Sequence, residues 1–252
     1  MVSNRSLGVG AAALFAASLL FVGAMYARDA WVVRSLVHHN LEARGGEALV
    51  AGVSSLRLSG QMDVGRGLHV PYVLEQKKPD KVCLQFEFDG NTAIQCSDGQ
   101  QGWKVVPHRG SSTPAPMTAE EIREVSSFAD PSSPLWDPAR GVRVRRLGRA
   151  TVRDKQTEKL EVSSSDGVVR WVYVDPDTGL EVKIEATRTL AGRERRVDTY
   201  LSDWKATPEG LMVARRMETQ TEGDPASHLL TVESVAVNPP LDDARFTRPP
   251  QR

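Results

Sequence analysis

The chain has 252 residues and carries 32 basic and 32 acidic side chains, so its formal net charge is zero. This balance gives no electrostatic reason to expect a nucleic acid partner. The basic residues between Arg140 and Arg153 alternate with apolar ones, which is typical of the solvated face of a strand.

An uncharged apolar stretch lies near the start of the chain. It covers residues 7–27, follows Arg5 and ends before Arg28. Residues 1–27 therefore predict a signal peptide, with Val22-Gly23-Ala24 as small residues for cleavage, or an N-terminal membrane anchor of about 21 apolar residues. Both alternatives export residues 28–252, which we expect to form one domain. That domain is either free in the periplasm or anchored in the inner membrane and facing the periplasm.

Two helices are predicted in the exported part. Val33, Leu36, Val37 and Leu41 have helical spacing, so we expect a helix from Asp29 to Arg44 that ends at Gly45-Gly46, with a further turn over Glu47–Ala51. Thr118-Ala-Glu-Glu121 is a capping box and predicts a helix to about Phe128. Gly, Ser and Pro residues predict loops over residues 107–117 and 130–138.

Most of the remaining sequence alternates with period two, which predicts strands with one buried face. In the first half these strands lie around residues 56–62, 70–75, 82–88, 92–97 and 102–106, and in the second half they are Val142–Val152, Lys159–Ser164, Val168–Val174, Leu180–Thr189, Arg193–Asp203, Leu211–Glu218 and His228–Val237. Strand follows strand, so the sheet is antiparallel, and its length makes it curl. The predicted fold is α+β: a strongly curved antiparallel sheet of about 11–12 strands, an incomplete β-barrel, wrapped around two or three helices.

Cys83 and Cys96 flank the hairpin signal Asp89-Gly90-Asn91. A two-residue turn places the cysteines opposite each other, and an oxidising compartment then permits a disulfide. A three-residue turn pairs Leu84 with Cys96 and turns Cys83 to the other face. Matching apolar side chains favours the second register, and the disulfide stays open.

No residue pattern localises catalysis, a metal or a cofactor. The five histidines lie on separate elements or side by side on one helix, and no nucleophile, Walker or dinucleotide motif is present. Asp175, Asp177 and Gly179 start like a calcium loop but lack its remaining ligands, and a turn explains them. We therefore expect no enzyme, metal or cofactor.

Apolar residues of successive strands are expected to share the concave face of the sheet. They are Leu56, Leu58, Met62, Tyr72, Leu74, Leu84, Phe86 and Trp103. An ordinary core packed on the first helix explains this periodicity. The alternative is a ligand cavity, because a long curled sheet has more concave surface than two or three helices cover.

Five sequence segments, taken in their order across residues 40–246, carry a family resemblance. They read NLEARGGEALVAGVSSLRLSGQM, KKPDKVCLQFEFDGNTAIQCSDGQQGWKV, VRWVYVDPDTGLEVKIEA, DTYLSDWKATPEGLMVARRME and VNPPLDDARF. Together they resemble outer-membrane lipoprotein-sorting-protein-like (LolA/LolB-like) periplasmic proteins. The resemblance implies an incomplete barrel around an apolar cavity for acyl chains. The chain departs from the LolB type because no acylated cysteine follows its apolar run.

The resemblance implies a periplasmic carrier or binder of lipid or lipoprotein, acting in outer-membrane lipoprotein sorting or envelope lipid transport. Its partners are then acyl chains or lipoproteins and inner- and outer-membrane proteins. The lid candidates are loop 107–117, the helix from Thr118 and loop 130–138, and we expect Trp136 to plug the mouth of the cavity. The alternative is a membrane-tethered sensor or scaffold domain of the same fold. An envelope hydrolase is a more distant alternative.

Overall fold

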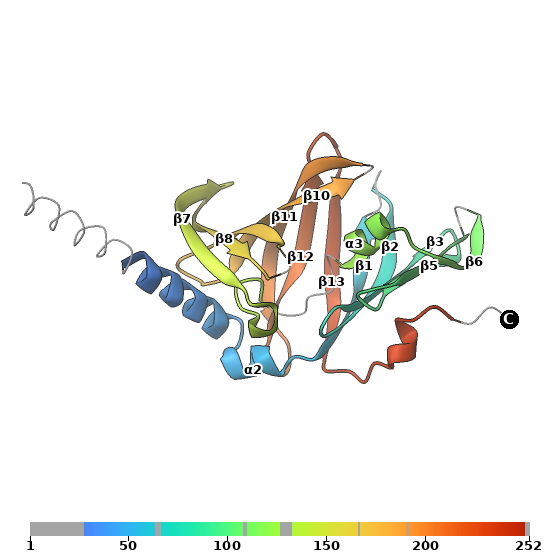
Figure 1. The fold of residues 1–252 in the computed structure, drawn as a ribbon, viewed down its shortest axis with the longest axis horizontal. Helices are drawn as coiled ribbons and strands as arrows, with labels where there is room; N and C mark the ends of the chain where they lie inside the picture. The colour runs from blue at the N-terminus through green and yellow to red at the C-terminus, as the bar shows by residue number, and fades with distance from the viewer. Residues whose placement is uncertain are drawn as a thin grey trace, which may run out of the picture.

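A single open antiparallel sheet of 13 strands dominates the computed structural model, which describes residues 28–63, 67–107, 110–126, 133–165, 167–190 and 192–249 (Figure 1). The strands of the first half are β1 (Ser55–Asp63), β2 (His69–Lys77), β3 (Lys81–Phe88), β4 (Asn91–Ser97), β5 (Gly102–Val106) and β6 (Ser111–Pro116). Those of the second half are β7 (Arg143–Val152), β8 (Lys155–Ser163), β9 (Val169–Val174), β10 (Glu181–Leu190), β11 (Arg193–Ala206), β12 (Met212–Thr221) and β13 (Ser227–Val237).

The sheet order is β6-β5-β4-β3-β2-β1-β13-β12-β11-β10-β9-β8-β7. Each half is a meander of neighbouring hairpins, and the halves join where β1 pairs with β13. The two edges of the sheet, β6 and β7, are therefore consecutive in sequence. The connection between them, residues 117–142, runs from one edge of the sheet to the other.

The helix in that connection, α3 (Ala119–Ser126), reveals how strongly the sheet curves. It contacts β3 and β4 in one half and β10 in the other. In a flat sheet β3 and β10 would lie about 29 Å apart, at about 4.8 Å per strand spacing, whereas a helix is only about 10 Å wide. The sheet therefore curls around α3, as Figure 1 shows, and we call the face that α3 contacts the inner face.

The remaining helices lie near the start of the described chain. Residues 28–43 form a helix, and α2 (Glu47–Gly52) follows it, which confirms both expectations for this region. The capping box at α3 is also confirmed: the Thr118 amide donates to Glu121, and the Glu121 amide donates to the Thr118 hydroxyl. Short 3₁₀ turns occur at Pro138–Arg140 and Asp243–Arg245. The apolar stretch 7–27 lies outside the described residues, within which no helix has the length and apolarity needed to cross a membrane.

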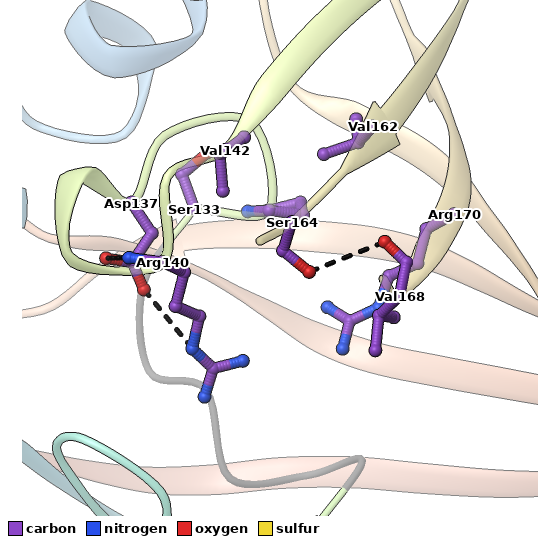
Figure 2. Close-up of a pocket in the computed structure, with 9 residues that line it drawn as sticks. Ser133, Asp137, Arg140, Val142, Val162, Ser164, Val168 and Arg170 are labelled. Carbon is purple, nitrogen blue, oxygen red and sulfur yellow. Dashed lines mark hydrogen bonds and ion pairs between the residues drawn. The ribbon is translucent and has the colours of Figure 1, made fainter. Parts of the chain in front are cut away.

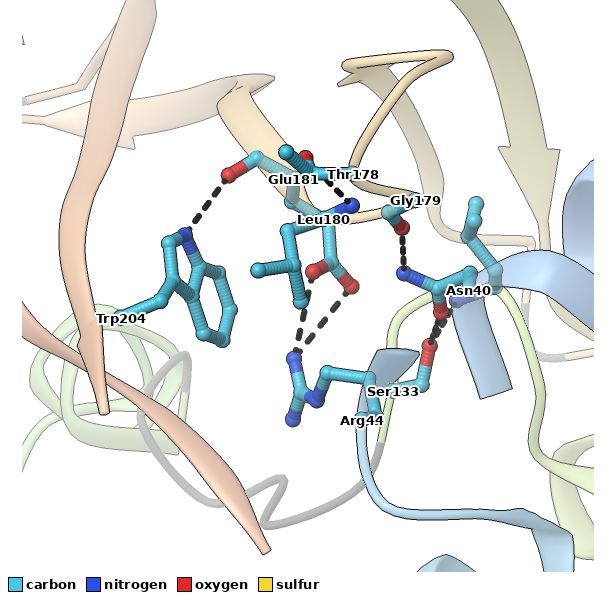
Figure 3. Close-up of polar contacts among 9 residues, drawn as sticks. Asn40, Arg44, Ser133, Thr178, Gly179, Leu180, Glu181 and Trp204 are labelled. Carbon is cyan, nitrogen blue, oxygen red and sulfur yellow. Dashed lines mark hydrogen bonds and ion pairs between the residues drawn. The ribbon is translucent and has the colours of Figure 1, made fainter. Parts of the chain in front are cut away.

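Buried polar contacts attach the first helix to the sheet (Figure 3). The Asn40 amide donates to the Gly179 carbonyl over 2.8 Å and accepts from the Ser133 hydroxyl over 2.7 Å. One turn later, Arg44 donates to both carboxylate oxygens of the fully buried Glu181 over 3.3 Å. Asn40 thus holds the helix, the β9–β10 turn and the segment after α3 in one place.

Two local expectations are wrong. Residues 111–116 were expected in a loop, because of their Ser and Pro residues, but form the edge strand β6. Pro114 and Pro116 fit there because an edge strand has one side without a pairing partner. The sheet accordingly has 13 strands instead of 11–12.

The favoured three-residue register of the β3–β4 hairpin is wrong as well. Cys83 lies opposite Cys96, and the two cysteines form a disulfide. Asp89 and Gly90 have φ angles of 51° and 70°, as both central residues of a two-residue type I′ turn must. The turn therefore sets the register, and apolar matching across the strands does not.

The chain after β13 packs on the outer face of the first half. Phe246 is 0% exposed and joins Leu241, Trp103 and the two cysteines in an outer cluster. We call residues 239–246 the C-terminal clasp. The buried Glu75 adds two ion pairs under the clasp, with Arg57 of β1 and with Arg245 of the clasp.

The clasp has an acid-sensitive contact. Lys77 and Lys81 each lie 2.7 Å from a carboxylate oxygen of Asp243, and their hydrogen bonds lower the pKa of this group from 3.8 to about 2. A depressed folded-state pKa contributes stability above pH 3.8 that is lost as the pH falls towards 2. We expect Asp243→Asn to flatten the acid unfolding curve in this window. Because the contact is exposed, the difference should shrink in high salt. Tryptophan fluorescence measured against pH would check this, and equal curves would contradict it.

Candidate functional site: the apolar inner face

Most of the apolar residues predicted to share a face do so. Leu58, Tyr72 and Leu74 are buried in the main inner cluster, and Met62, Leu84 and Phe86 are partly buried against it. Leu56 lies on the same face, in a neighbouring cluster beside the first helix and α2. The second half contributes Leu230 and Val232 of β13 to the main cluster. The inner face is thus a continuous apolar wall across the join of the two halves.

Trp103 is the exception, and its expected place on this face is wrong. It lies opposite Cys96, which lies opposite Cys83, and this row of residues faces outward. Trp103 contributes to the cluster under the C-terminal clasp instead. The two-residue turn of the β3–β4 hairpin places Trp103 on the outer face, because a register shift of one residue would exchange the two faces.

Residues 117–126, which we call the cover segment, pack on the inner wall. Met117 and Val125 are buried in the main cluster, and Ile122 packs against it. Lys104 of β5 forms an ion pair with Glu121, and a Cβ on Gly102 would lie 2.8 Å from Ile122, so helix and strand touch closely. The wall is therefore covered by one short helix and the residue that leads into it.

Trp136 packs against the cluster of Leu41, Val50 and Leu56, beside the first helix and α2. Its neighbour Leu135 is 2% exposed and lies between the first helix and the inner side of β8 and β9. The segment 133–140 thus covers a second apolar area, separate from that under α3.

The hydroxyl of Tyr72 is an unusual polar group on this wall. It is buried, and no residue in the described part of the chain hydrogen-bonds to it. Burial, followed by the nearby charge of Glu233, raises the pKa of Tyr72, so the phenol stays neutral. A hydroxyl donor in an apolar wall can bond the ester or carboxyl oxygen of an entering molecule.

Arginines also reach the inner face, and the sequence analysis did not single them out. Arg170 of β9 lies two residues before Val172 and Arg188 of β10 four residues after Ile184, so each is on the same face as that apolar residue. Arg215 of β12 lies two residues before Met217 and thus on the same face, and its Nε and Nη1 are buried without a hydrogen-bond partner among the described residues. The sequence does contain a signal for them, because each arginine occupies a position where the period-two pattern of its strand expects an apolar residue.

Two pockets lined by described residues lie away from the main apolar wall. A narrow cavity of about 20 Å³ lies between the segment 133–140 and β7–β9 (Figure 2). Arg140, Val162 and Arg170 are among its lining residues. A shallow polar depression of about 480 Å³ lies at the β7–β8 and β9–β10 turns. The main wall is filled by the cover segment in this structure.

No group of three or more potential metal-ligating side chains occurs among the described residues. The described part of the inner face offers apolar contact, the buried hydroxyl of Tyr72 and guanidinium groups without a carboxylate partner among the described residues. This arrangement suits binding.

No protein-family model matches this sequence, and neither does any curated protein sequence. Solved structures do match. A LolA superfamily protein from Nitrosomonas europaea is 14% identical with a TM-score of 0.57, and the match covers 85% of this chain and 97% of that one. A domain from Vibrio parahaemolyticus described as an outer membrane lipoprotein-sorting protein is 14% identical with a TM-score of 0.58 and the same coverage. The chain therefore has the fold of LolA superfamily proteins, with the apolar inner face closed by the cover segment.

Proposed function

We propose that this protein binds and carries acyl chains of lipids or lipoproteins in the periplasm, without performing chemistry. The observation that carries the proposal is the apolar wall on the inner face, which a short, separately attached segment covers. The fold shared with a LolA superfamily protein and with a lipoprotein-sorting domain supports it. Residues 7–27 would deliver the protein to this compartment, as a cleaved signal or as an anchor.

Binding requires the cover segment to leave the wall, and magnitudes decide whether an acyl chain can displace it. Covering the wall buries three apolar side chains, Met117, Ile122 and Val125. At about 1.5–3 kcal/mol each, they contribute about 5–9 kcal/mol. An acyl chain of about fourteen methylenes gains about 11 kcal/mol at about 0.8 kcal/mol per methylene. One chain therefore suffices to displace the cover, while in its absence the closed form protects the wall from water.

The test is to purify the full chain, extract it with organic solvent and identify bound lipids by mass spectrometry. We expect phospholipid or acylated peptide in near-stoichiometric amount. After delipidation, the protein should take up a fluorescent fatty acid. Purified protein that contains no lipid and takes up no fatty acid would overturn the proposal.

Trp136 gives a second prediction, because we propose that it closes the part of the inner face beside the first helix and α2. Trp136→Ala removes a partly buried indole from the cluster around Leu56, so the open form should become more populated. We expect fluorescent fatty acid to exchange at least about fivefold faster, as measured by stopped-flow fluorescence.

The matched control for this variant is Trp31→Ala. Trp31 is 65% exposed on the first helix, so its loss should leave the exchange rate unchanged. An unchanged rate in Trp136→Ala would show that Trp136 is not part of the closure.

A further inference from the structure

Several arginines of the second half of the sheet have a carboxylate partner. The ion pairs are Arg145–Glu161, Arg146–Glu158, Arg153–Glu218 and Arg196–Asp198. Arg170 and Arg188 differ. No described residue forms an ion pair or a hydrogen bond with either guanidinium group, although both lie on the inner face beside apolar residues.

The two arginines interact with each other. Burial first, and the positive charge of Arg170 second, lower the pKa of Arg188, whereas Glu124 of the cover segment raises it. Arg188 also lies opposite Arg195 in the β10–β11 pairing, and like charges in that position destabilise a sheet. Arg195 is satisfied elsewhere, since it donates to the Glu222 carbonyl over 3.2 Å. The described part of the chain thus supplies Arg170 and Arg188 with no ion-paired anion, which a half-buried pair of guanidinium groups requires.

Both arginines lie beside the second apolar area, on the same inner face as the main wall. Val172, next to Arg170 on the same face, is 0% exposed, and Ile184 packs in the same cluster. An apolar surface that ends in two cations without an anionic partner among the described residues fits a molecule with apolar chains and an anionic end. Guanidinium groups bind phosphate with paired hydrogen bonds, which makes phosphate the best-suited anion.

We infer that Arg170 and Arg188 form a binding site for a phosphate group, presented by a lipid head group or free in solution. The lipid form rests on the proposed function, because the chains would then lie against the inner wall. When the cover segment leaves, Glu124 leaves with it, so Arg188 loses an acid that acts on it while the apolar wall becomes accessible. One movement thus opens both parts of an amphiphile site. In the closed form, the cavity beside Arg170 has a volume of about 20 Å³, enough for about one water molecule.

The experiment measures how the delipidated full chain, in a neutral detergent, binds three probes. These are fluorescent phosphatidylglycerol, fluorescent diacylglycerol with the same chains but no phosphate, and inorganic phosphate. We expect phosphatidylglycerol to bind at least about tenfold more tightly than diacylglycerol. The double variant Arg170→Gln/Arg188→Gln should lose this preference without losing diacylglycerol binding. Arg188→Lys, which keeps the charge but not the paired hydrogen bonds of a guanidinium group, should retain only part of the preference.

The control is Arg145→Gln/Arg153→Gln, which removes two outer-face arginines and should change nothing. Circular dichroism verifies that each variant is folded. Phosphate binding that depends on Arg170 and Arg188, with equal affinity for both lipids, would support the site with free phosphate as its ligand. If neither the lipid preference nor phosphate binding depends on the two arginines, the inference is overturned. If neither lipid binds at all, the proposed function fails, and the phosphate measurement still decides the anion site.

Discussion

Truncation of Val125 to alanine is expected to accelerate lipid uptake about tenfold. Val125 is 2% exposed and packs α3 against the inner wall. Val125→Ala removes two carbon groups from the cluster, a loss of about 1.6 kcal/mol at about 0.8 kcal/mol per buried carbon group. Because this contact exists only when the cover segment is closed, the open population should rise about tenfold, and with it the uptake rate. Stopped-flow fluorescence with a labelled fatty acid measures this rate.

The matched control is Val174→Ala. Val174 is 0% exposed but belongs to the cluster of β8 and β9, which the cover segment does not join. Its truncation should lower the free energy of unfolding by a similar amount without accelerating uptake. Equal acceleration in both variants would mean that general loosening of the fold admits lipid, and no acceleration in Val125→Ala would mean that the cover segment does not gate entry.

The strands could be predicted well because each has one buried and one exposed face. The alternation of Val144 with arginines located β7, and that of Leu160 with Lys159 and Glu161 located the second half of β8, from the sequence alone. The edge strand β6 was missed because Pro114 and Pro116 are unfavourable in a paired strand. Their tolerance depends on β6 being the last strand of the sheet, which is a property of the whole topology.

The inner-face residues could be predicted within each strand, but the face of a residue beyond a turn depends on the length of that turn. Leu58, Leu74 and Leu84 were assigned to one face correctly because they lie in register. Trp103 was assigned wrongly because its face depends on the length of the Asp89-Gly90 turn, which the apolar pattern favoured at three residues. That Arg170 and Arg188 have no ion-pair partner among the described residues could not be predicted either, since the partners of an arginine are set by tertiary contacts.

The packing of the C-terminal clasp was also beyond the sequence. Phe246 follows a Pro- and Asp-rich stretch and shows no periodicity. Only the structure places it over Trp103 and the disulfide, on the face opposite the proposed lipid site. The outer cluster therefore stabilises the first half of the sheet from outside, so that the inner wall does not have to supply a permanent core there.

This division of roles predicts that Phe246→Ala destabilises the fold without impairing lipid binding. Phe246 is 0% exposed, and truncating a fully buried phenylalanine costs about 3–5 kcal/mol. Urea unfolding with the disulfide intact should show this loss, whereas Arg248→Ala, two residues further on and exposed, should show almost none. Under folding conditions the variant should still take up the fluorescent fatty acid with unchanged affinity, because Phe246 lies outside the curl of the sheet. A stability loss below about 1 kcal/mol would refute the stabilising role of the clasp, and lost lipid affinity in the folded variant would show that the two faces are coupled.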